Sequence, residues 1–419
     1  MKTLFNKIYG IGESKIYNNF FRLPVIFITI FALLAALLIG LYTLPIDKAV
    51  QKNVSKANAS GYTARTDLDP FTNNVFILGI SKSATSKHPI FSALNAPNHP
   101  PQFNPEMSMS EFIRQQDMSL SYGNYWHGWA LYLRPLLTVF NYSQIVVINA
   151  IILSALVLLI CYLLFRRKNY ISIVFLLLTL WALDFRTLYL SQTFFTPTLI
   201  ALLACLLVIW KFGFKEKPLI YATGVFLIIG MLTSYVDMLT YPLVTFVLPV
   251  GMLLLTGNKV TDWQKNLILA FKAGIAWLAG YLALWFGKFL VFGYMISPGR
   301  LNESLGKLGK YTDGSGFDIL KNVFKVGYGN SSNLMLWLFI GIAIALIIFA
   351  IIKRKEFPAL LPAAALIILP IAYIYFTKGH SVIHARFTFK TIMLPIFTIG
   401  CCIDIMVMKF LVNQNSEKS

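Results

Sequence analysis

The chain has 419 residues, of which 57% are hydrophobic and only 13% are charged, and its mean hydropathy is +0.67. This composition excludes a soluble domain of any size, because apolar runs of about twenty residues recur and each can cross the ~30 Å hydrocarbon core of a membrane as a helix. The net charge of +19 does not indicate a nucleic-acid partner, since many lysines and arginines lie in short connections between apolar runs, where they set topology.

The apolar runs predict an all-α, polytopic helical membrane protein with about ten transmembrane helices and two large outward loops. The predicted spans are residues 23–44, 144–165, 170–185, 193–211, 218–235, 240–256, 267–287, 334–352, 357–376 and 389–411. The first run is long and lacks a small-residue cleavage site, so we interpret it as a retained anchor rather than a signal peptide. The remaining segments are a cytoplasmic N-terminus (1–22), outward loops (45–143 and 288–333) and a cytoplasmic tail (412–419).

The positive charges support this orientation. Short connections predicted inside carry basic residues within 166–168, 211–217, 259–265 and 353–355. Two of the short connections predicted outside hold Asp184 with Arg186, and Asp237 alone. An excess of lysine and arginine in short loops marks the cytoplasmic side. We therefore expect a multi-pass membrane protein with both termini in the cytoplasm.

The first large outward loop ends in segments predicted to be helices at the membrane interface. One helix is predicted to begin at Ser110, and the stretch from Trp126 to Arg134 is amphipathic and rich in aromatic rings. Tryptophan and tyrosine favour the headgroup region, whereas His127 and Arg134 need water or a polar ligand. We therefore expect residues 125–140 to form one wall of a cavity with the short outward loops, with His127 and Arg134 binding substrate.

All five histidines lie on the predicted outer side, and two aspartates there are candidates for catalysis. Asp47 directly follows the first span, so its carboxylate can act as a general base at the membrane surface or hold a cation. An ordinary helix-end charge paired with Lys48 is the alternative. Asp237 occupies a very tight connection between two apolar spans, where an unpaired charge is costly. For Asp237 the alternative is a structural salt bridge or a helix cap.

Two further outward connections contain candidate substrate-binding residues. Asp184 and Arg186 share one connection, where they either contact a substrate or neutralise each other. The last outward loop carries His380, His384 and Arg386. Histidines four residues apart share a helix face, a spacing also compatible with zinc. A cluster of histidine, arginine and lysine suits a phosphate or pyrophosphate headgroup better, because arginine offers a bidentate fork. Anchoring at the lipid interface is the alternative.

Four segments of the chain resemble a known type of membrane protein. They are Tyr125–Leu137, Phe140–Ile145, Tyr235–Val244 and His380–Phe389. Together they resemble a group of uncharacterised bacterial polytopic membrane proteins over most of the chain. The plan of that group is in turn similar to the GT-C membrane glycosyltransferases. Those enzymes share a large outward first loop with interfacial helices, an acidic residue at the start of that loop, and a second large outward loop.

This resemblance implies an enzyme of the bacterial cell membrane whose donor is a sugar on polyprenyl phosphate and whose acceptor is an envelope glycan. Asp47 stands where the catalytic carboxylate of these enzymes stands, although Lys48 follows it where many of them have a second acid. On this hypothesis Asp47 is the base, and Asp237 is a supporting acid or a contact to a divalent cation. The loop with His380, His384 and Arg386 binds the lipid phosphate.

A non-enzymatic membrane protein is the second hypothesis, either a transporter of envelope lipids or an assembly factor. Transporters commonly hold ionisable residues at mid-depth in their spans. The predicted spans hold few such residues, since Lys272 lies near a cytoplasmic end and Asp404 is the main exception. This distribution favours the enzyme.

Overall fold

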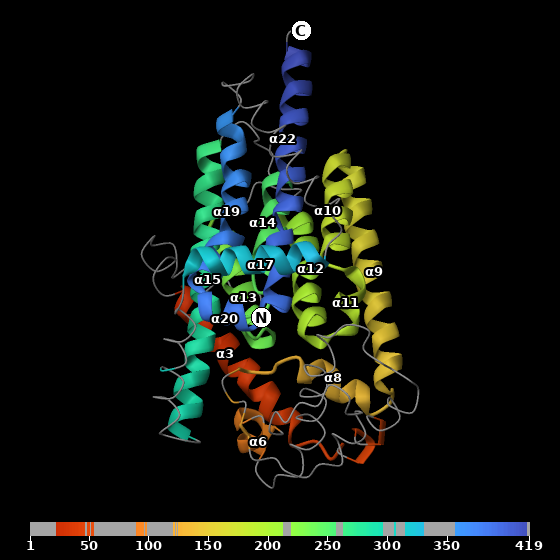
Figure 1. The fold of residues 1–419 in the computed structure, drawn as a ribbon, viewed down its shortest axis with the longest axis vertical. Helices are drawn as coiled ribbons and strands as arrows, with labels where there is room; N and C mark the ends of the chain where they lie inside the picture. Colours follow the sequence, from red (N-terminus) through yellow and green to blue (C-terminus); the bar gives the residue numbers. More distant parts are fainter. Residues whose placement is uncertain are drawn as a thin grey trace, which may run out of the picture.

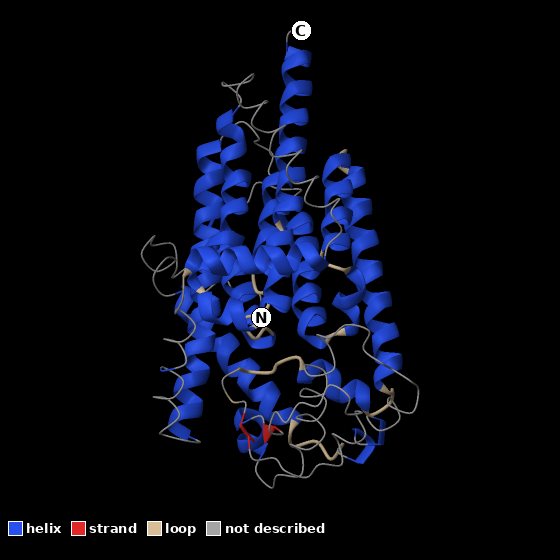
Figure 2. Cartoon of the chain, in the orientation of Figure 1, coloured by secondary structure: helices blue, strands red, loops and turns tan. Residues whose placement is uncertain are grey.

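The computed structural model describes residues 22–46, 48–50, 52–53, 89–95, 97–98, 120–121, 123, 125–212, 219–256, 263–295, 306, 315–330 and 357–416. Within these ranges the chain is helical almost throughout, and most helices run along the long axis of the molecule (Figures 1 and 2). Two short strands, β1 (Pro97–Asn98) and β2 (Leu120–Ser121), pair antiparallel and join two parts of the first large loop.

The helices keep the labels of Figure 1. In chain order they are α3 (Arg22–Leu41), α6 (Pro89–Asn95), α8 (Ala130–Leu137), α9 (Tyr142–Arg166), α10 (Tyr170–Ala182), α11 (Phe185–Leu190), α12 (Gln192–Phe212), α13 (Leu219–Val236), α14 (Val244–Thr256), α15 (Trp263–Met295), α17 (Gly316–Asn330), η2 (Phe357–Leu360), α19 (Leu361–Phe376), α20 (Lys378–Ile383), α21 (Ala385–Thr388), η3 (Phe389–Met393) and α22 (Pro395–Ser416). The last helix runs beyond the predicted end of the tenth span at residue 411.

Six helices among the described residues are long and apolar enough to cross a membrane. These segments are Arg22–Leu41, Tyr142–Arg166, Gln192–Trp210, Trp263–Val291, Pro358–Phe376 and Phe389–Val407. Three shorter apolar helices are Tyr170–Ala182, Ala222–Val236 and Val244–Leu255. Each of these segments overlaps a predicted span, so the prediction of a helical membrane-type protein is confirmed. The predicted span at 334–352 and the predicted helix start at Ser110 lie outside the described residues.

The centre of the bundle is held by close helix packing. A Cβ atom on Gly230 of α13 would lie 2.0 Å from the Trp277 carbonyl oxygen, and one on Gly280 of α15 would lie 2.2 Å from the Leu227 carbonyl oxygen. The two helices therefore cross with backbones in contact, as helices with small residues at the crossing do in membranes. Next to them, α14 packs against α12 and α22.

The amphipathic segment predicted to be helical from residue 126 becomes helical only at Ala130, where α8 begins. His127 has a left-handed backbone with φ of 54°, and the Gly128 amide donates to the Tyr235 carbonyl at 2.7 Å. The prediction of a helix over 126–129 is therefore wrong. The reason is tertiary: this amide bonds α13 rather than a carbonyl of its own helix, and a buried amide needs one such acceptor.

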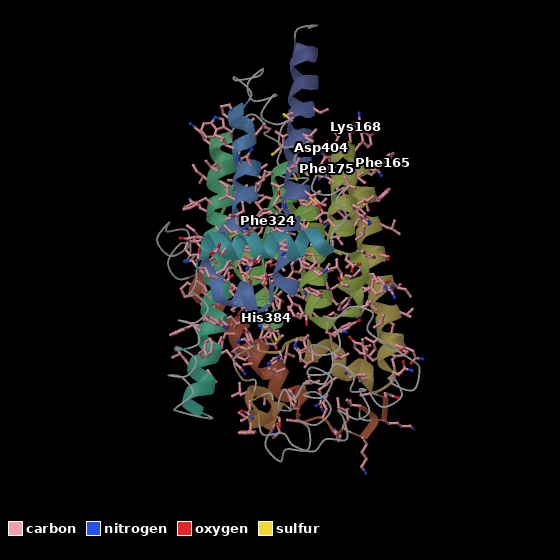
Figure 3. The ribbon with its side chains drawn as sticks, viewed as in Figure 1. Phe165, Lys168, Phe175, Phe324, His384 and Asp404 are labelled. Carbon is pink, nitrogen blue, oxygen red and sulfur yellow. The ribbon has the colours of Figure 1, made fainter. Side chains whose placement is uncertain are left out.

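Polar groups lie at different levels of the bundle. Figure 3 shows Asp404 and Lys168 toward the end where the C-terminus lies, and His384 farther along the long axis, below α17. The Asp404 Oδ2 atom accepts from the Ser172 amide at 2.8 Å, so it satisfies an open donor in the first turn of α10. Asp404, the main ionisable residue within the predicted spans, is thus a helix cap far from the histidines.

Candidate functional site

The candidate site centres on the tight turn between α13 and α14. Asp237 is 2% exposed, and its Oδ1 atom accepts from the Thr240 hydroxyl at 2.8 Å and from the Tyr241 amide at 3.0 Å. Leu239, inside the turn, has a left-handed backbone with φ of 60°. A carboxylate that bonds donors three and four residues ahead stabilises such a turn. Asp237 therefore acts as a cap, which was one of the two structural alternatives.

The surroundings of Asp237 also determine its protonation. Burial raises the pKa of its carboxyl from 3.8 to about 6, while the Thr240 hydroxyl and nearby amides oppose the rise by donating hydrogen bonds. No cation contributes to this pKa among the side chains that the structure describes. The Tyr281 hydroxyl of α15 donates to Oδ2 at 3.4 Å. A carboxyl of this kind exchanges its proton near neutral pH, as a general acid or base must.

Two other helices reach the backbone of the same turn. The Tyr373 hydroxyl of α19 donates to the Leu239 carbonyl, and the backbone of Leu239 lies close enough to His380 of α20 to raise the pKa of its imidazole. His380 is buried, and its ring centroid lies 4.6 Å from that of His384. The structure therefore brings the predicted acid Asp237 and the predicted histidine pair together through one residue.

Both histidines are neutral at neutral pH. Burial and, after it, the neighbouring His384 lower the pKa of His380 from 6.5 to about 3, and the nearby backbone of Leu239 opposes this decrease. Burial also lowers the pKa of His384. A neutral imidazole offers one donor and one acceptor instead of a charge. Any contact of this pair with a phosphate is therefore a hydrogen bond without ionic attraction.

Lys390 ties this loop to another part of the bundle. Its ammonium, 1% exposed, donates to the Leu183 carbonyl and, at 2.7 Å, to the Thr187 hydroxyl. It also lies 4.9 Å from the ring centroid of Phe194. The Phe194 ring is in edge contact with Tyr241, at a centroid distance of 6.0 Å. Aromatic packing thus connects the anchored lysine to the Asp237 turn.

Asp184 and Arg186 lie beside that lysine on the surface. Both side chains are exposed, and Asp184 has a left-handed backbone with φ of 55°. The Asp184 carbonyl, rather than its carboxylate, accepts from the Thr187 amide and hydroxyl, each at 2.9 Å. Among the described residues no ion pair between these two side chains is found, and their contact with a substrate stays a prediction. Both remain accessible to a ligand.

His127 and Arg134 belong to a neighbouring part of the same region. His127 lies between the rings of Tyr125 and Trp129, at centroid distances of 6.4 and 5.8 Å. A Cβ atom on Gly128 would lie 1.9 Å from the Tyr235 ring, so this segment packs directly on α13, next to Asp237. Only glycine permits so close an approach.

Arg134 is fully buried, with its guanidinium carbon 4.8 Å from the ring centroid of Tyr42. This stacking against an aromatic face is a cation–π contact. It fixes α8 to the turn that follows α3, and it leaves the guanidinium without solvent exposure.

One buried group of this region, Lys288, was not singled out from the sequence. The Lys288 ammonium donates to the Leu94 carbonyl at 2.8 Å and lies 5.1 Å from the Trp126 ring centroid. The Trp126 indole donates to the Leu284 carbonyl at 3.0 Å. The signal available in the sequence was a lysine just after the apolar run 267–287. Tyr281 and Tyr373, the other missed residues, are hydroxyls within apolar runs and carry no such signal.

Two predicted residues have no described side chain. Asp47 lies outside the described residues, and Arg386 belongs to α21 without a described side chain. Among the residues that are described, no group of three histidine, cysteine, aspartate or glutamate side chains can hold a metal ion. The two histidines alone provide fewer ligands than a structural zinc site uses.

No protein-family model matches the chain, and neither a curated protein nor a solved structure matches it.

Proposed function

We propose that the protein is a GT-C-like membrane glycosyltransferase that uses a sugar carried on polyprenyl phosphate at the outer face of a bacterial cell membrane. One observation carries the proposal. Asp237 and His380 come from separate predicted outward connections, and the backbone of Leu239 affects the pKa of both. A carboxyl with a pKa near neutrality and an imidazole pair on the same turn are groups that glycosyl transfer to a hydroxyl can use.

The proposed topology has ten spans and both termini in the cytoplasm. It adds the predicted span 334–352 to the six long and three shorter apolar helices. Support comes from Lys168 and the C-terminus, which lie toward one end of the bundle, and from His384, which lies well away from that end (Figure 3). The basic connections would then face the cytoplasm.

In the proposed reaction the hydroxyl oxygen of an envelope glycan attacks the anomeric carbon of the donor sugar. The bond from that carbon to the phosphate oxygen breaks, and polyprenyl phosphate leaves with the electron pair. A carboxylate takes the hydroxyl proton, a role assigned to Asp47 with Asp237 in support. His380, His384 and Arg386 would bind the leaving phosphate, while His127, Asp184 and Arg186 would contact the sugar or acceptor. Arg134 is fully buried against Tyr42, so its predicted contact with substrate does not fit the structure.

A divalent cation at Asp237 does not fit the described residues. The Oδ1 atom already accepts two hydrogen bonds and Oδ2 accepts a third. A hard cation usually takes several oxygen ligands, with more than one carboxylate among them. No step of the proposed reaction therefore runs through a metal at this position.

The test compares envelope glycans and lipids of a deletion strain with those of strains that carry wild-type or variant protein. We expect donor lipid to accumulate in the deletion strain and in D47N, since loss of a general base lowers turnover about 10²–10⁴-fold. R386A should instead weaken binding of the lipid phosphate. D318N, an exposed change on α17, is the matched control. Unchanged glycans and lipids in the deletion strain would refute the transferase.

The burial of Asp237 favours a second candidate function, a non-enzymatic transporter of envelope lipids or an assembly factor. Its carboxyl is 2% exposed, and both oxygens are used by the turn and by Tyr281. In that case D47N should behave as wild type, whereas D237A, which breaks the turn, should still impair the protein.

A further inference from the structure

The helix α17 has three distinct faces. Residues four apart in an α-helix lie on one face, and each single step turns the face by about 100°. Ile319 and Val323 are buried against the bundle. The next pair along is apolar: Leu320 is half-buried at the edge of the core, and Phe324 is 45% exposed.

Four further described side chains of α17 are polar and exposed. Lys321 and Lys325 form the face that adjoins Phe324, and Asp318 and Asn322 complete the turn. A helix with a protein-facing, an apolar and a charged sector matches an interface between protein, lipid tails and water.

The position of α17 agrees with this division. It crosses the bundle transverse to the long helices (Figure 1), and a Cβ atom on Gly316 at its start would lie 2.5 Å from the Tyr375 ring. Tyr375 is in the last turn of α19, a candidate span. The exposed stripe of α19, which includes Ile368 and Ile371 and ends at Tyr375 and Phe376, therefore meets α17 where the span ends.

We propose that α17 lies in the headgroup region of one leaflet, with Leu320 and Phe324 against acyl chains and Lys321 and Lys325 against anionic phospholipid headgroups. The lysines supply the charge complementarity, and Lys378, whose ammonium is 4.6 Å from the Tyr375 ring centroid, adds a third cation at the end of α19. Amphipathic helices with this pattern bind membrane surfaces.

The proposal has a consequence for the candidate site and is independent of the transferase proposal. Besides α19, α17 contacts α20, α21 and η3. These short helices contain or adjoin His380 and His384. Lipid attachment of α17 therefore holds the histidine segment at the level of the membrane surface.

Spin labels on the full chain in bilayer nanodiscs test the orientation. The four native cysteines are replaced, and single cysteines at positions 318 to 325 carry a nitroxide. At 320 and 324 we expect collisions with oxygen to exceed those with a water-soluble nickel chelate, and at 318 and 322 the reverse. If position 324 were as open to nickel as 322, or shielded from both reagents as under a second protein copy, the proposal would fail.

Lipid retention tests the charge in a background that keeps the native cysteines. The protein is purified from discs of phosphatidylcholine with phosphatidylglycerol, and the retained phosphatidylglycerol is measured. K321Q/K325Q should lower its affinity by about fivefold per lysine. The swap K321Q/N322K keeps the net charge but moves the cation away from Phe324, so it should bind as weakly as K321Q. Wild-type binding by either double variant would contradict the assigned orientation.

Discussion

Replacing Asp237 by asparagine should remove a pH dependence of stability that arises from one buried carboxyl. Burial raises the folded-state pKa of this group to about 6, against 3.8 for an exposed aspartate. The folded protein therefore binds the proton more tightly than the unfolded chain does. The stabilising contribution is fully present below the unfolded pKa and is lost as the pH rises through the folded one. From about pH 5 to pH 8 this loss amounts to about 1.4 kcal/mol.

The histidines act in the opposite direction. Burial lowers the pKa of His380 and of His384, so the unfolded chain binds their protons more tightly, and stability falls as the pH drops below about 6.5. The informative quantity is therefore the difference between wild type and D237N at each pH. Asparagine keeps the Oδ1 acceptor for Thr240 and Tyr241, so the turn is preserved.

The assay is unfolding by SDS in dodecylmaltoside micelles, followed by circular dichroism at several pH values. D318N, at an exposed position of α17, is the control and should follow wild type at every pH. D237A removes the acceptor and leaves the buried Tyr241 amide without its bond, so it should lower stability by about 2–4 kcal/mol throughout. The free energy of unfolding of wild type minus that of D237N should decrease from pH 5 to pH 8. A difference that stays constant over this range, or that increases with pH, would refute the reasoning.

Three further predictions concern packing and topology. G128A places a Cβ atom 1.9 Å from an aromatic ring of α13, so it should lower the free energy of unfolding by about 2–3 kcal/mol. G40A is the control, because a Cβ atom there meets nothing within 4 Å, and it should be neutral or slightly stabilising in the same unfolding assay. K390M leaves two acceptors without their buried donor and should lower stability by about 2 kcal/mol, and a wild-type unfolding curve would contradict the anchoring role. In intact cells an impermeant thiol reagent should modify a cysteine at position 310 but not one at 354, and the reverse pattern would invert the topology.

The sequence by itself determined where the helices are. Length and hydropathy are local properties, and every predicted span with described residues overlaps an apolar helix. The start of α8 could not be predicted in the same way. The aromatic segment before Ala130 has a helical pattern, but a bond from the Gly128 amide to α13 competes with the helix and prevails.

For the candidate site residues too, some properties could be predicted from the sequence and others only from the structure. Asp237 and His380 could be selected from the sequence because a carboxylate or a histidine at the edge of an apolar run is rare. The sequence could not predict that the same Leu239 backbone affects the pKa of both residues, or that the histidines are neutral. Both properties follow from burial and from contacts across the bundle. Tyr281 and Tyr373 were missed for this reason, since a tyrosine in an apolar run shows nothing of its partner.

What the sequence alone determined is therefore the membrane class of the protein and the connections in which polar groups gather, since these depend on the order of apolar and charged residues along the chain. The tertiary structure alone decided which of these groups meet and which become caps or anchors. Asp404 caps α10, and Lys390 anchors η3 to the end of α10. The physical reason is that a buried polar group must find a partner, and that partner is supplied by whichever helix packs against it.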